Sequence, residues 1–428
     1  DLRCPECDGT EFERERDILD VWFDSGSSHE AILGQHPELE WPYTVYLEGS
    51  DQYRGWFHSS LLIGLGTRNA APYRQVITNG FVVDKAGRKM SKSAGNTVEP
   101  QAIINQSGAD VLRLWVAMVD YREEVRIGPE ILARVIEAYR KIRNTLRILV
   151  ANLYDFDPAT DAMPRDALQD VDRYALARYG EVATRVLRGY DRYEFQSAVH
   201  ALINYLTVDL SAFYVDISKD RLYTFGPGSD ARRSAQTAIH TIVDGLTRLI
   251  APILPMTADE LWRSLPGADA DSVHLADFPT GLESLVDPEL IDRWDRLLRV
   301  RDAVNSGLET LRRDKVVGTS LEAVVHLTAN GELATLLERY HEELPTLFIT
   351  SAVTLTRGTP AEADDDALFQ YQDPEGSARI EVGRPDAAKC PRCWRWVCPE
   401  TTDGHDRENT EVCARCANAL ADAVSPVA

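Results

Sequence analysis

The chain has 428 residues, of which 44% are hydrophobic and 27% are charged, a composition typical of a soluble globular protein with about two to four domains. Its formal net charge of −22 excludes a protein that coats nucleic acid nonspecifically, but leaves room for a specific nucleic-acid partner at a local basic patch. The sequence contains no signal-peptide pattern, and we find no apolar run of membrane-spanning length. We therefore expect a cytoplasmic protein that does not contact membranes.

The first segment with a regular pattern lies between Tyr43 and Val83. "YTVYLEG" predicts a buried strand, "DQYRGWFHSSLLIGLG" a helix, and "QVITNGFVV" a second strand. This order predicts a βαβ unit with parallel strands, whose ligands lie at the carboxyl ends of the strands. The stretches "EGSDQ" and "KMSKS" both follow such strand ends.

Helical patterns dominate the next part of the chain, which we expect to be a bundle of about five helices. The long amphipathic segments are 129–150, 170–191, 194–223, 229–251 and 257–265. A further helix is expected over 289–314, followed by "SLEAVVHLT" and "LFITSAVTL", which predict two strands of a small α/β module. The acidic stretch "PAEADDDALFQYQDPEG" then predicts a linker or an exposed hairpin.

The short segment "GRKMSKSAGN" (Gly87–Asn96) has an unusual composition. The chain has seven lysines, and three of them, Lys85, Lys89 and Lys92, fall within eight residues. Two mobile ammonium groups suit a polyphosphate that gains negative charge as a bond breaks. For an arbitrary K-x-x-K sequence a solvated hairpin tip is the more common explanation, but "KMSKS" matches the second signature of the class I aminoacyl-tRNA synthetases.

The flanking segments narrow this resemblance. "LDVWFDSGSSH", "YLEGSDQYRGWFHSSL" and "GRKMSKSAGN", in this order, resemble the isoleucyl-tRNA synthetases, as do "FYVDISKDRLY" and "APILPMTADELW". The resemblance covers nearly the whole chain and implies the carboxyl-terminal portion of a bacterial enzyme. We find neither a "HIGH"-type sequence nor an editing domain.

The resemblance implies four parts. Residues 1–128 are expected to form the C-terminal half of a Rossmann-type parallel-sheet catalytic domain, and residues 129–288 a helical-bundle anticodon-binding domain. Residues 289–385 are expected to form a helix with a small α/β module, and residues 386–428 a zinc-binding module. The fold class is therefore α/β plus all-α.

The resemblance also implies an activity and its partners. The expected reaction is the ATP-dependent activation of isoleucine to isoleucyl-adenylate, followed by transfer to tRNA(Ile), with Mg²⁺ entering alongside ATP. The expected partners are tRNA(Ile), isoleucine, ATP and the missing N-terminal half of the same enzyme, and we expect a monomer.

Site residues follow from the matched motifs. Lys89, Ser91, Lys92 and Ser93 are the expected catalytic residues, with Lys92 on the ATP phosphates. Glu48, Gly49, Asp51 and Gln52 are expected to contact the adenylate, although Ser50 or Asp51 could instead cap a helix. Trp22 and Trp56 are expected to form the walls of the aliphatic side-chain pocket rather than serve only as core aromatics. Lys85, outside the signature, is expected to be solvated.

A basic stripe lies within "RVIEAYRKIRNTLR". Arg140, Arg143 and Arg147 share one face of the expected helix, in a segment with five cations and one anion. Such a stripe is usually a solvated face, but in a bundle that resembles an anticodon-binding domain it favours phosphate contacts.

Six of the seven cysteines lie in three CxxC pairs, and two of these pairs predict a metal site. Cys390, Cys393, Cys413 and Cys416 are spaced so that four thiolates can surround one structural Zn²⁺. Cys398 is expected to be a free thiol, with exchange into the site left open, and His405 a loop residue. Trp394 and Trp396 suit stacking on tRNA nucleotides or packing on the knuckle. Cys4 and Cys7 resemble half of a further knuckle.

Two rival interpretations remain at this stage. One is a valyl- or leucyl-tRNA synthetase relative, and the other is a non-catalytic tRNA-binding protein built from the bundle and the zinc module. Because half of the nucleotide-binding sheet is expected to be missing, we predict that this chain alone does not activate isoleucine.

Overall fold

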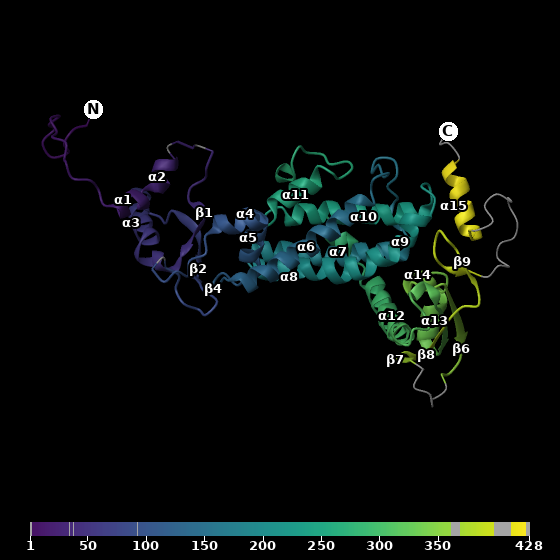
Figure 1. Ribbon diagram of the computed structural model, residues 1–428. Coiled ribbons are helices and arrows are strands. Elements are labelled where there is room, and N and C mark those ends of the chain that lie inside the picture. The colour runs from purple at the N-terminus through teal and green to yellow at the C-terminus, as the bar shows by residue number, and fades with distance from the viewer. Residues whose placement is uncertain are drawn as a thin grey trace. The chain divides into compact units, whose positions relative to one another are not determined.

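The computed structural model of the chain describes residues 2–33, 35–36, 38–91, 93–360, 369–397 and 412–424. The chain divides into two compact units, the first formed by Asp1–Glu99 with Val119–Ile131 and the second by Pro100–Met118 with Leu132–Ala428. In the ribbon of Figure 1 the first unit is purple to blue, and most of the second is teal, green and yellow.

The first unit contains the predicted βαβ arrangement. Strands β1 (Tyr43–Gly49) and β2 (Tyr73–Asn79) are parallel, with Tyr43 opposite Tyr73 and Gly49 opposite Asn79. They are joined by the short helix η1 (Ser50–Arg54) and by α3 (Trp56–Arg68). The register shows that both strands end at the same edge, so the residues after Gly49 and those after Asn79 leave the sheet together.

Shorter elements complete this unit. They are α1 (Val21–Gly26), α2 (Ser28–Leu33), and the parallel pair β3 (Val82–Val83) and β4 (Val125–Arg126). Helix α1 packs tightly on α3, because a Cβ atom added at Gly26 would lie only 2.7 Å from Ser59 Oγ.

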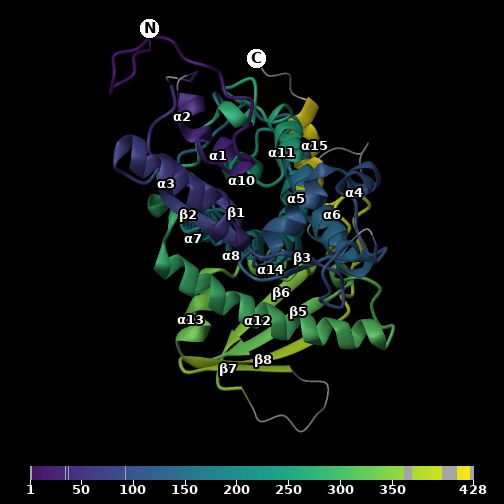
Figure 2. The same cartoon turned by 90° about the vertical axis from the view of Figure 1, so that its left-hand side faces the viewer.

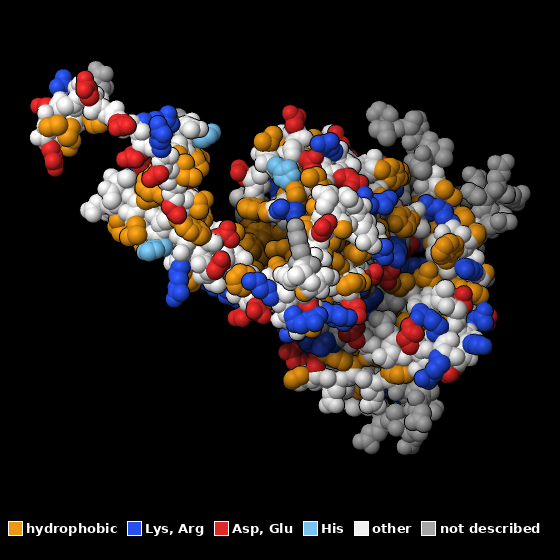
Figure 3. All heavy atoms as spheres, turned by 60° about the vertical axis from the view of Figure 1, so that its left-hand side comes forward, with side chains coloured by type: hydrophobic (Ala, Val, Ile, Leu, Met, Phe, Trp, Pro, Cys, Tyr) orange, Lys and Arg blue, Asp and Glu red, His pale blue; other side chains and the backbone are white. Residues whose placement is uncertain are grey.

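The β1–β2 sheet has two strands in the part of the chain that the structure describes, and apolar side chains are exposed around it. Apolar groups are visible as orange spheres on the surface of this unit in Figure 3. Exposed members include Leu47 on β1 and Val76 on β2, at 58% and 39% exposure. The apolar faces of parallel strand pairs are normally covered, whereas part of the apolar surface of this pair is exposed.

The second unit begins with a helical bundle close to the predicted one. Its helices are α4 (Pro100–Ser107), α5 (Ala109–Met118), α6 (Pro129–Ala151, which starts in the first unit), α7 (Asp170–Asp191), α8 (Phe195–Asn204), α9 (Val215–Thr224), α10 (Asp230–Ile250) and α11 (Pro255–Trp262). Short 3₁₀ turns are η2 (Arg165–Ala167), η4 (Val273–Leu275), η5 (Leu282–Leu285) and η6 (Ser320–Glu322). The buried apolar positions recur at helical spacing, as in Ile239, Ile242, Val243 and Leu246 on α10.

Helices α8 and α9 are joined without a break by η3 (Tyr205–Tyr214), a ten-residue π-helical segment. The resulting run, Phe195–Thr224, is long and apolar enough to cross a membrane by length and composition, which corrects our reading that no such run exists. Half of the most apolar stretch of this run is buried inside the protein.

A buried ion pair fixes α9 against α7 and α10. Both Nη atoms of Arg221 donate to the Asp172 carboxylate, each at 2.8 Å, and both side chains are at most 6% exposed. Tyr214 Oη and Ser234 Oγ donate to the same carboxylate at 2.6 and 2.5 Å. These hydrogen bonds compensate for the desolvation of the two charges, so that loss of either partner would leave an unpaired buried charge.

The module after the bundle is a four-stranded sheet with helices packed on it (Figure 2). The strand order is β6 (Ala352–Arg357), β5 (Val324–Ala329), β8 (Gly376–Gly383) and β7 (Phe369–Asp373), and the helices are α12 (Pro288–Arg313), α13 (Gly331–Arg339) and α14 (Leu344–Leu347). Helix α12 lies close to the sheet, because a Cβ atom at Gly307 would come within 2.8 Å of Val382. The two predicted strands are β5 and β6, and the hairpin alternative for the acidic stretch is realised as β7–β8, while residues 361–368 lie outside the described residues.

Candidate functional site

The polar residues after β1 form a tight turn. Glu48 Oε1 accepts a hydrogen bond from the Gly49 N–H at 2.9 Å, and a Cβ atom at Gly49 would lie 2.6 Å from Asp51 Oδ1. Gln52 Oε1 accepts from the Trp56 N–H at 2.9 Å, at the first residue of α3. Gly55 is the N-cap residue of α3, and Gln52, rather than Ser50 or Asp51, accepts the N–H of its first residue. The carboxylates of Glu48 and Asp51 are exposed.

The two predicted pocket tryptophans meet around Gly55. A Cβ atom at Gly55 would lie 2.8 Å from the Trp22 ring and 2.5 Å from Gln52 Oε1, so a larger residue there would require these side chains to shift. Trp56 stacks on Tyr46, with ring centroids 4.2 Å apart and planes 5° apart, and its Nε1 donates to the Ser25 carbonyl at 3.1 Å. Trp22 is 47% exposed. Trp56 thus has a fixed orientation, while Trp22 presents much of its indole to the surface.

The signature loop is folded around one carboxylate that the sequence analysis missed. Asp84, directly after β3, accepts hydrogen bonds from the N–H groups of Ala86 and Arg88 and from Arg88 Nε, each at 2.9 Å. Asn96 Nδ2 donates to the same carboxylate at 3.1 Å. Backbone donation from Arg88 and the hydrogen bond from Asn96 hold the pKa of Asp84 well below its usual range.

Asn96 ties the second half of the loop to the first. Its Oδ1 accepts from the Ser91 N–H at 3.0 Å, and its Nδ2 also lies 3.3 Å from the Lys89 carbonyl oxygen. Ser91 Oγ lies 3.2 Å from Ser93 Oγ and accepts from the Ala94 N–H at 3.2 Å. Lys89 itself is exposed, and its backbone forms an isolated bridge to Val83. Both predicted serines are therefore used to shape the loop.

Of the other two lysines in this segment, the structure describes Lys85 but not Lys92. Lys92 lies outside the described residues, so its role stays a prediction. Lys85 is 72% exposed, with its Nζ 4.0 Å from Glu130, in agreement with the expectation of a solvated side chain.

Replacing Asp84 with asparagine is expected to lower the hydrogen-exchange protection of the Arg88 amide at pH 7. Because the pKa of Asp84 is depressed from 3.8 in the folded state, the carboxylate contributes its full stabilisation above pH ~4, and this is lost as the pH falls toward the folded pKa. The difference in protection between the two proteins should therefore shrink below pH ~4. Asp120→Asn, in the same unit, is the matched control and should leave the Arg88 amide unchanged. A constant difference across this pH range would contradict the assignment.

The basic stripe lies on α6, where its three arginines are not equivalent. Arg143 Nη2 donates to both carboxylate oxygens of Glu260 on α11, at 2.7 and 2.9 Å. Arg140 and Arg147 are exposed and have no ion-pair partner among the described residues. The free cations of the stripe are thus the two outer arginines.

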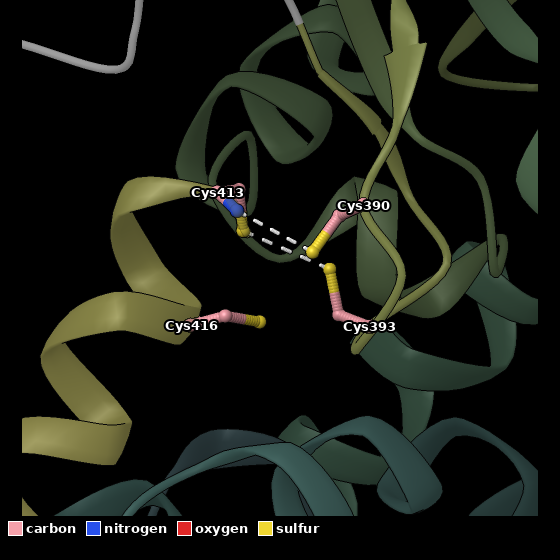
Figure 4. Close-up of side chains that lie close together, drawn as sticks. All are labelled: Cys390, Cys393, Cys413 and Cys416. Carbon is pink, nitrogen blue, oxygen red and sulfur yellow. Dashed lines mark hydrogen bonds between the residues drawn. The ribbon is translucent and has the colours of Figure 1, made fainter. Parts of the chain in front are cut away.

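The four predicted cysteines come together near the carboxyl end of the second unit (Figure 4). Cys390 and Cys393 lie at a hairpin of β9 (Ala388–Lys389) and β10 (Trp396–Val397), and Cys413 and Cys416 lie at the start of α15 (Ala414–Val424). All four Sγ atoms are buried and lie within 4.8 Å of one another. A tetrahedral zinc site with Zn–S bonds of ~2.3 Å places its sulfur atoms ~3.8 Å apart. The 3.8 Å separation of the Cys393 and Cys413 sulfurs fits that geometry.

The environment of the sulfurs also suits a metal. Burial opposes ionisation of Cys390, but the backbone N–H groups of Cys393, Cys413 and Arg392 outweigh it and lower the pKa of this thiol to about 6. The pKa values of the other three thiols are raised by burial, so a cation is needed to hold all four as thiolates.

The two tryptophans beside the cysteine cluster, Trp394 and Trp396, lie in different environments. Trp394 is 60% exposed, with Lys389 Nζ 5.9 Å from its ring centroid. Trp396 is half-buried beneath the Arg384 guanidinium, 5.2 Å from its ring centroid. Trp394 is therefore available to a partner, and Trp396 packs within the module.

The other cysteines do not join this group. Cys398 and His405 lie outside the described residues. Cys4 and Cys7 share a turn closed by a hydrogen bond from Asp8 N to the Cys4 carbonyl at 2.9 Å, and within the described residues no third ligand lies with them.

Two family models match parts of the chain. Residues 3–128 match the family described as tRNA synthetases class I (I, L, M and V), and residues 172–327 match the anticodon-binding domain of tRNA ligase. The isoleucine–tRNA ligases of Moorella thermoacetica and Syntrophotalea carbinolica are each 48% identical to this chain over 98% of its length, and that of Geobacter sulfurreducens is 47% identical over 97%. The chain spans 45%, 44% and 44% of these three relatives, less than half of each.

A more distant solved structure shares the fold. The LeuRS of Agrobacterium radiobacter K84, in a ternary complex with tRNA and LeuAMS, aligns with a TM-score of 0.51 at 18% identity, covering 77% of this chain and 37% of that one. The expected fold class, a partial class I catalytic domain with a helical anticodon-binding domain, a small sheet and a four-cysteine cluster, is confirmed. The chain is a homologue of the isoleucine–tRNA ligases and corresponds to the carboxyl-terminal part of a class I aminoacyl-tRNA synthetase.

Proposed function

We propose that the chain forms part of an enzyme that activates isoleucine with ATP and transfers it to tRNA(Ile). The observation that supports this most strongly is the 48% identity to isoleucine–tRNA ligases over 98% of the chain. The rival interpretation of a valyl or leucyl enzyme is less well supported, because the curated relatives named above are all isoleucine–tRNA ligases.

The first unit supplies charge and position rather than a covalent nucleophile. In this proposal Lys89 and Lys92 neutralise the ATP phosphates as pyrophosphate leaves, with Mg²⁺ bound to the same phosphates. Asn96 braces the loop backbone through its hydrogen bonds to Asp84 and to the Lys89 carbonyl oxygen, which supports a defined position for the signature near the strand ends. Ser91 and Ser93 contribute by shaping the loop, as their mutual hydrogen bond indicates.

The strand-end turn receives the amino acid and the adenosine. Glu48 and Asp51 offer acceptors for an ammonium or for ribose hydroxyls, and Gly49 lets the backbone approach the ligand. Trp56, fixed by its stacking on Tyr46, forms one wall of an aliphatic pocket, and Trp22 forms another. Such a pocket separates isoleucine from valine by only ~1–3 kcal/mol, the value of one methylene.

The second unit binds the tRNA. Arg140 and Arg147 are the proposed phosphate contacts, and Trp394, exposed beside the cysteine cluster, is the proposed stacking residue. The four cysteines hold one structural Zn²⁺ per chain, which ties the two knuckles together when bound. We place the protein in the cytoplasm, as a monomer.

Binding of a tRNA(Ile) transcript by the 428-residue chain tests the role of the basic stripe. Arg140→Ala and Arg147→Ala are each expected to weaken binding and to reduce the slope of log affinity against log salt by about 1, because each removes one phosphate contact. Arg143→Ala should change the slope less, since Glu260 already neutralises this guanidinium. Unchanged slopes for both outer arginines would remove the stripe from the interface.

The activity itself is tested by ATP–pyrophosphate exchange with isoleucine, valine and leucine. The isolated chain is expected to be inactive, because the β1–β2 sheet exposes apolar surface and offers two strands among the described residues. A chimera that joins the amino-terminal part of the Moorella thermoacetica relative in front of this chain should exchange with isoleucine and charge tRNA(Ile). Preference for valine or leucine would favour the sister enzymes, and tRNA binding by a correctly folded but inactive chimera would favour a non-catalytic binder.

A further inference from the structure

One carboxylate on the bundle binds both CxxC knuckles. Asp220 lies on α9, next to the buried Arg221 but directed toward the cysteine module. Its Oδ2 accepts from Arg395 Nη2 at 3.0 Å and from Arg415 Nη1 at 2.6 Å, and its Oδ1 accepts from Arg415 Nη2 at 2.8 Å. Thr224 Oγ1 donates to Asp220 Oδ1 at 2.7 Å, so both carboxylate oxygens are fully used.

The two arginines belong to different halves of the metal site. Arg395 follows Cys393 by two residues, whereas Arg415 lies between Cys413 and Cys416. They lie twenty positions apart in the sequence, and they reach one carboxylate because the two knuckles are brought together. A cation shared by the four thiolates would hold the two knuckles together.

Other contacts surround this carboxylate. Arg392, inside the first knuckle, donates to the Thr224 carbonyl and to the Cys416 sulfur. Arg395 Nη2 also donates to Thr346 Oγ1 on α14 at 3.0 Å, and the Arg415 guanidinium lies 4.9 Å from the centre of the Phe225 ring. Three arginines therefore meet at the carboxyl end of α9, where the helix dipole favours cations.

The contact of Asp220 with Arg395 and Arg415 depends on the charges of all three side chains. Asp220 is 19% exposed, and Arg395 and Arg415 are 16% and 33% exposed. Burial works against ionisation of Asp220, but hydrogen bonds from Arg415 and the charge of Arg395 outweigh it and lower the pKa of this carboxyl. If the module left α9, the arginines would be withdrawn, and a partly buried anion would lose its partners.

We propose that Asp220 is a metal-dependent latch, a positioning residue that docks the cysteine module onto the bundle when both knuckles are held by the metal. Docking and metal binding are then coupled. The latch favours the arrangement that binds metal, and metal loading in turn orders the carboxyl end of α9. Asp220 touches no thiolate, and it acts on the metal site only through Arg395 and Arg415.

Zinc affinity of the full 428-residue chain tests the first half of this coupling. With a chromophoric chelator as competitor, Asp220→Asn is expected to weaken Zn²⁺ binding about 10–100-fold, the usual effect of losing a partner outside the ligand shell. Asp216→Asn is the matched control, because Asp216 lies one turn earlier on the same helix and pairs with the exposed Lys219 at 2.7 Å. This control should bind Zn²⁺ as the parent chain does.

Hydrogen exchange followed by mass spectrometry tests the second half. Removing zinc from the parent chain and introducing Asp220→Asn into the zinc-loaded chain should raise exchange in the same peptides, at the end of α9 and in 388–397. Arg415→Gln alters the module and leaves the bundle unchanged, so it should reproduce both effects even if Asp220→Asn folds poorly. The double variant should be no worse than either single one. The proposal would be overturned if the losses of zinc affinity added up in the double variant. It would also be overturned if Asp220→Asn left both zinc affinity and hydrogen exchange unchanged.

Discussion

Replacing Lys92 with alanine in the active chimera is expected to slow isoleucine-dependent ATP–pyrophosphate exchange by about 10²–10³-fold, the usual cost of removing one preorganised group that stabilises transition-state charge. Negative charge grows on the leaving pyrophosphate, so the ammonium group interacts more strongly in the transition state than with bound ATP. The loss should therefore appear mainly in kcat, with a smaller change in the KM for ATP.

Lys85→Ala is the matched control for this substitution. It removes a lysine from the same segment, but its side chain is 72% exposed and lies outside the signature. ATP–pyrophosphate exchange should continue at the rate of the unsubstituted chimera. If Lys92→Ala also exchanged at that rate, the assignment of the signature loop to the phosphates would be wrong. A purely structural effect is recognised separately, because it would also lower the protection of the Arg88 amide.

Loss of one cysteine of the cluster is expected to abolish tight zinc binding. In Cys416→Ser the bound zinc, measured by elemental analysis after gel filtration, should fall from one atom per chain to a trace. Structural zinc contributes an apparent ~10–16 kcal/mol in small zinc-binding peptides, so three thiolates and a hydroxyl are expected to retain far less of it. Cys416 is fully buried, with 0% exposure, so its replacement changes the interior of the cluster and not its surface.

Cys4→Ser and Cys7→Ser supply the matched comparison within the same chain. These residues also form a CxxC pair, but in the described part of the chain no further ligand joins them. Both variants should keep one zinc per chain. Zinc loss from these variants, or full zinc retention by Cys416→Ser, would place the metal elsewhere.

Long periodic segments were predicted most accurately from the sequence. The expected helix 170–191 coincides with α7, because the apolar positions repeat along the helix and buried side chains such as Tyr174, Ala177 and Val186 follow that repeat. The four metal cysteines were also predictable, since their spacing alone restricts what they can do. The single helix expected after β1 was wrong in this detail, because η1 and α3 are separated at Gly55, whose backbone leaves the helical region with φ −136° and ψ −118°.

The residues that were missed act through tertiary contacts that leave no local pattern. Asp84 is one acidic residue among 68, and its importance arises from four hydrogen bonds that form only when the loop folds back. Asp220 lies in a motif that was recognised, yet its partners Arg395 and Arg415 lie far along the chain. Arg143 was grouped with its neighbours by helical spacing, and the distant Glu260 sets it apart.

The π-helical segment Tyr205–Tyr214 sets the angular offset between the two halves of the Phe195–Thr224 run. In an α-helix each residue turns the chain by about 100°, so deleting one residue here would swing everything beyond it through about that angle. Arg221 would then point away from Asp172, and Asp220 away from the arginines of the cysteine module. The length of this π-helical segment is therefore less free to vary than its side chains, because it orients one helix toward two different targets, Asp172 and the arginines of the cysteine module.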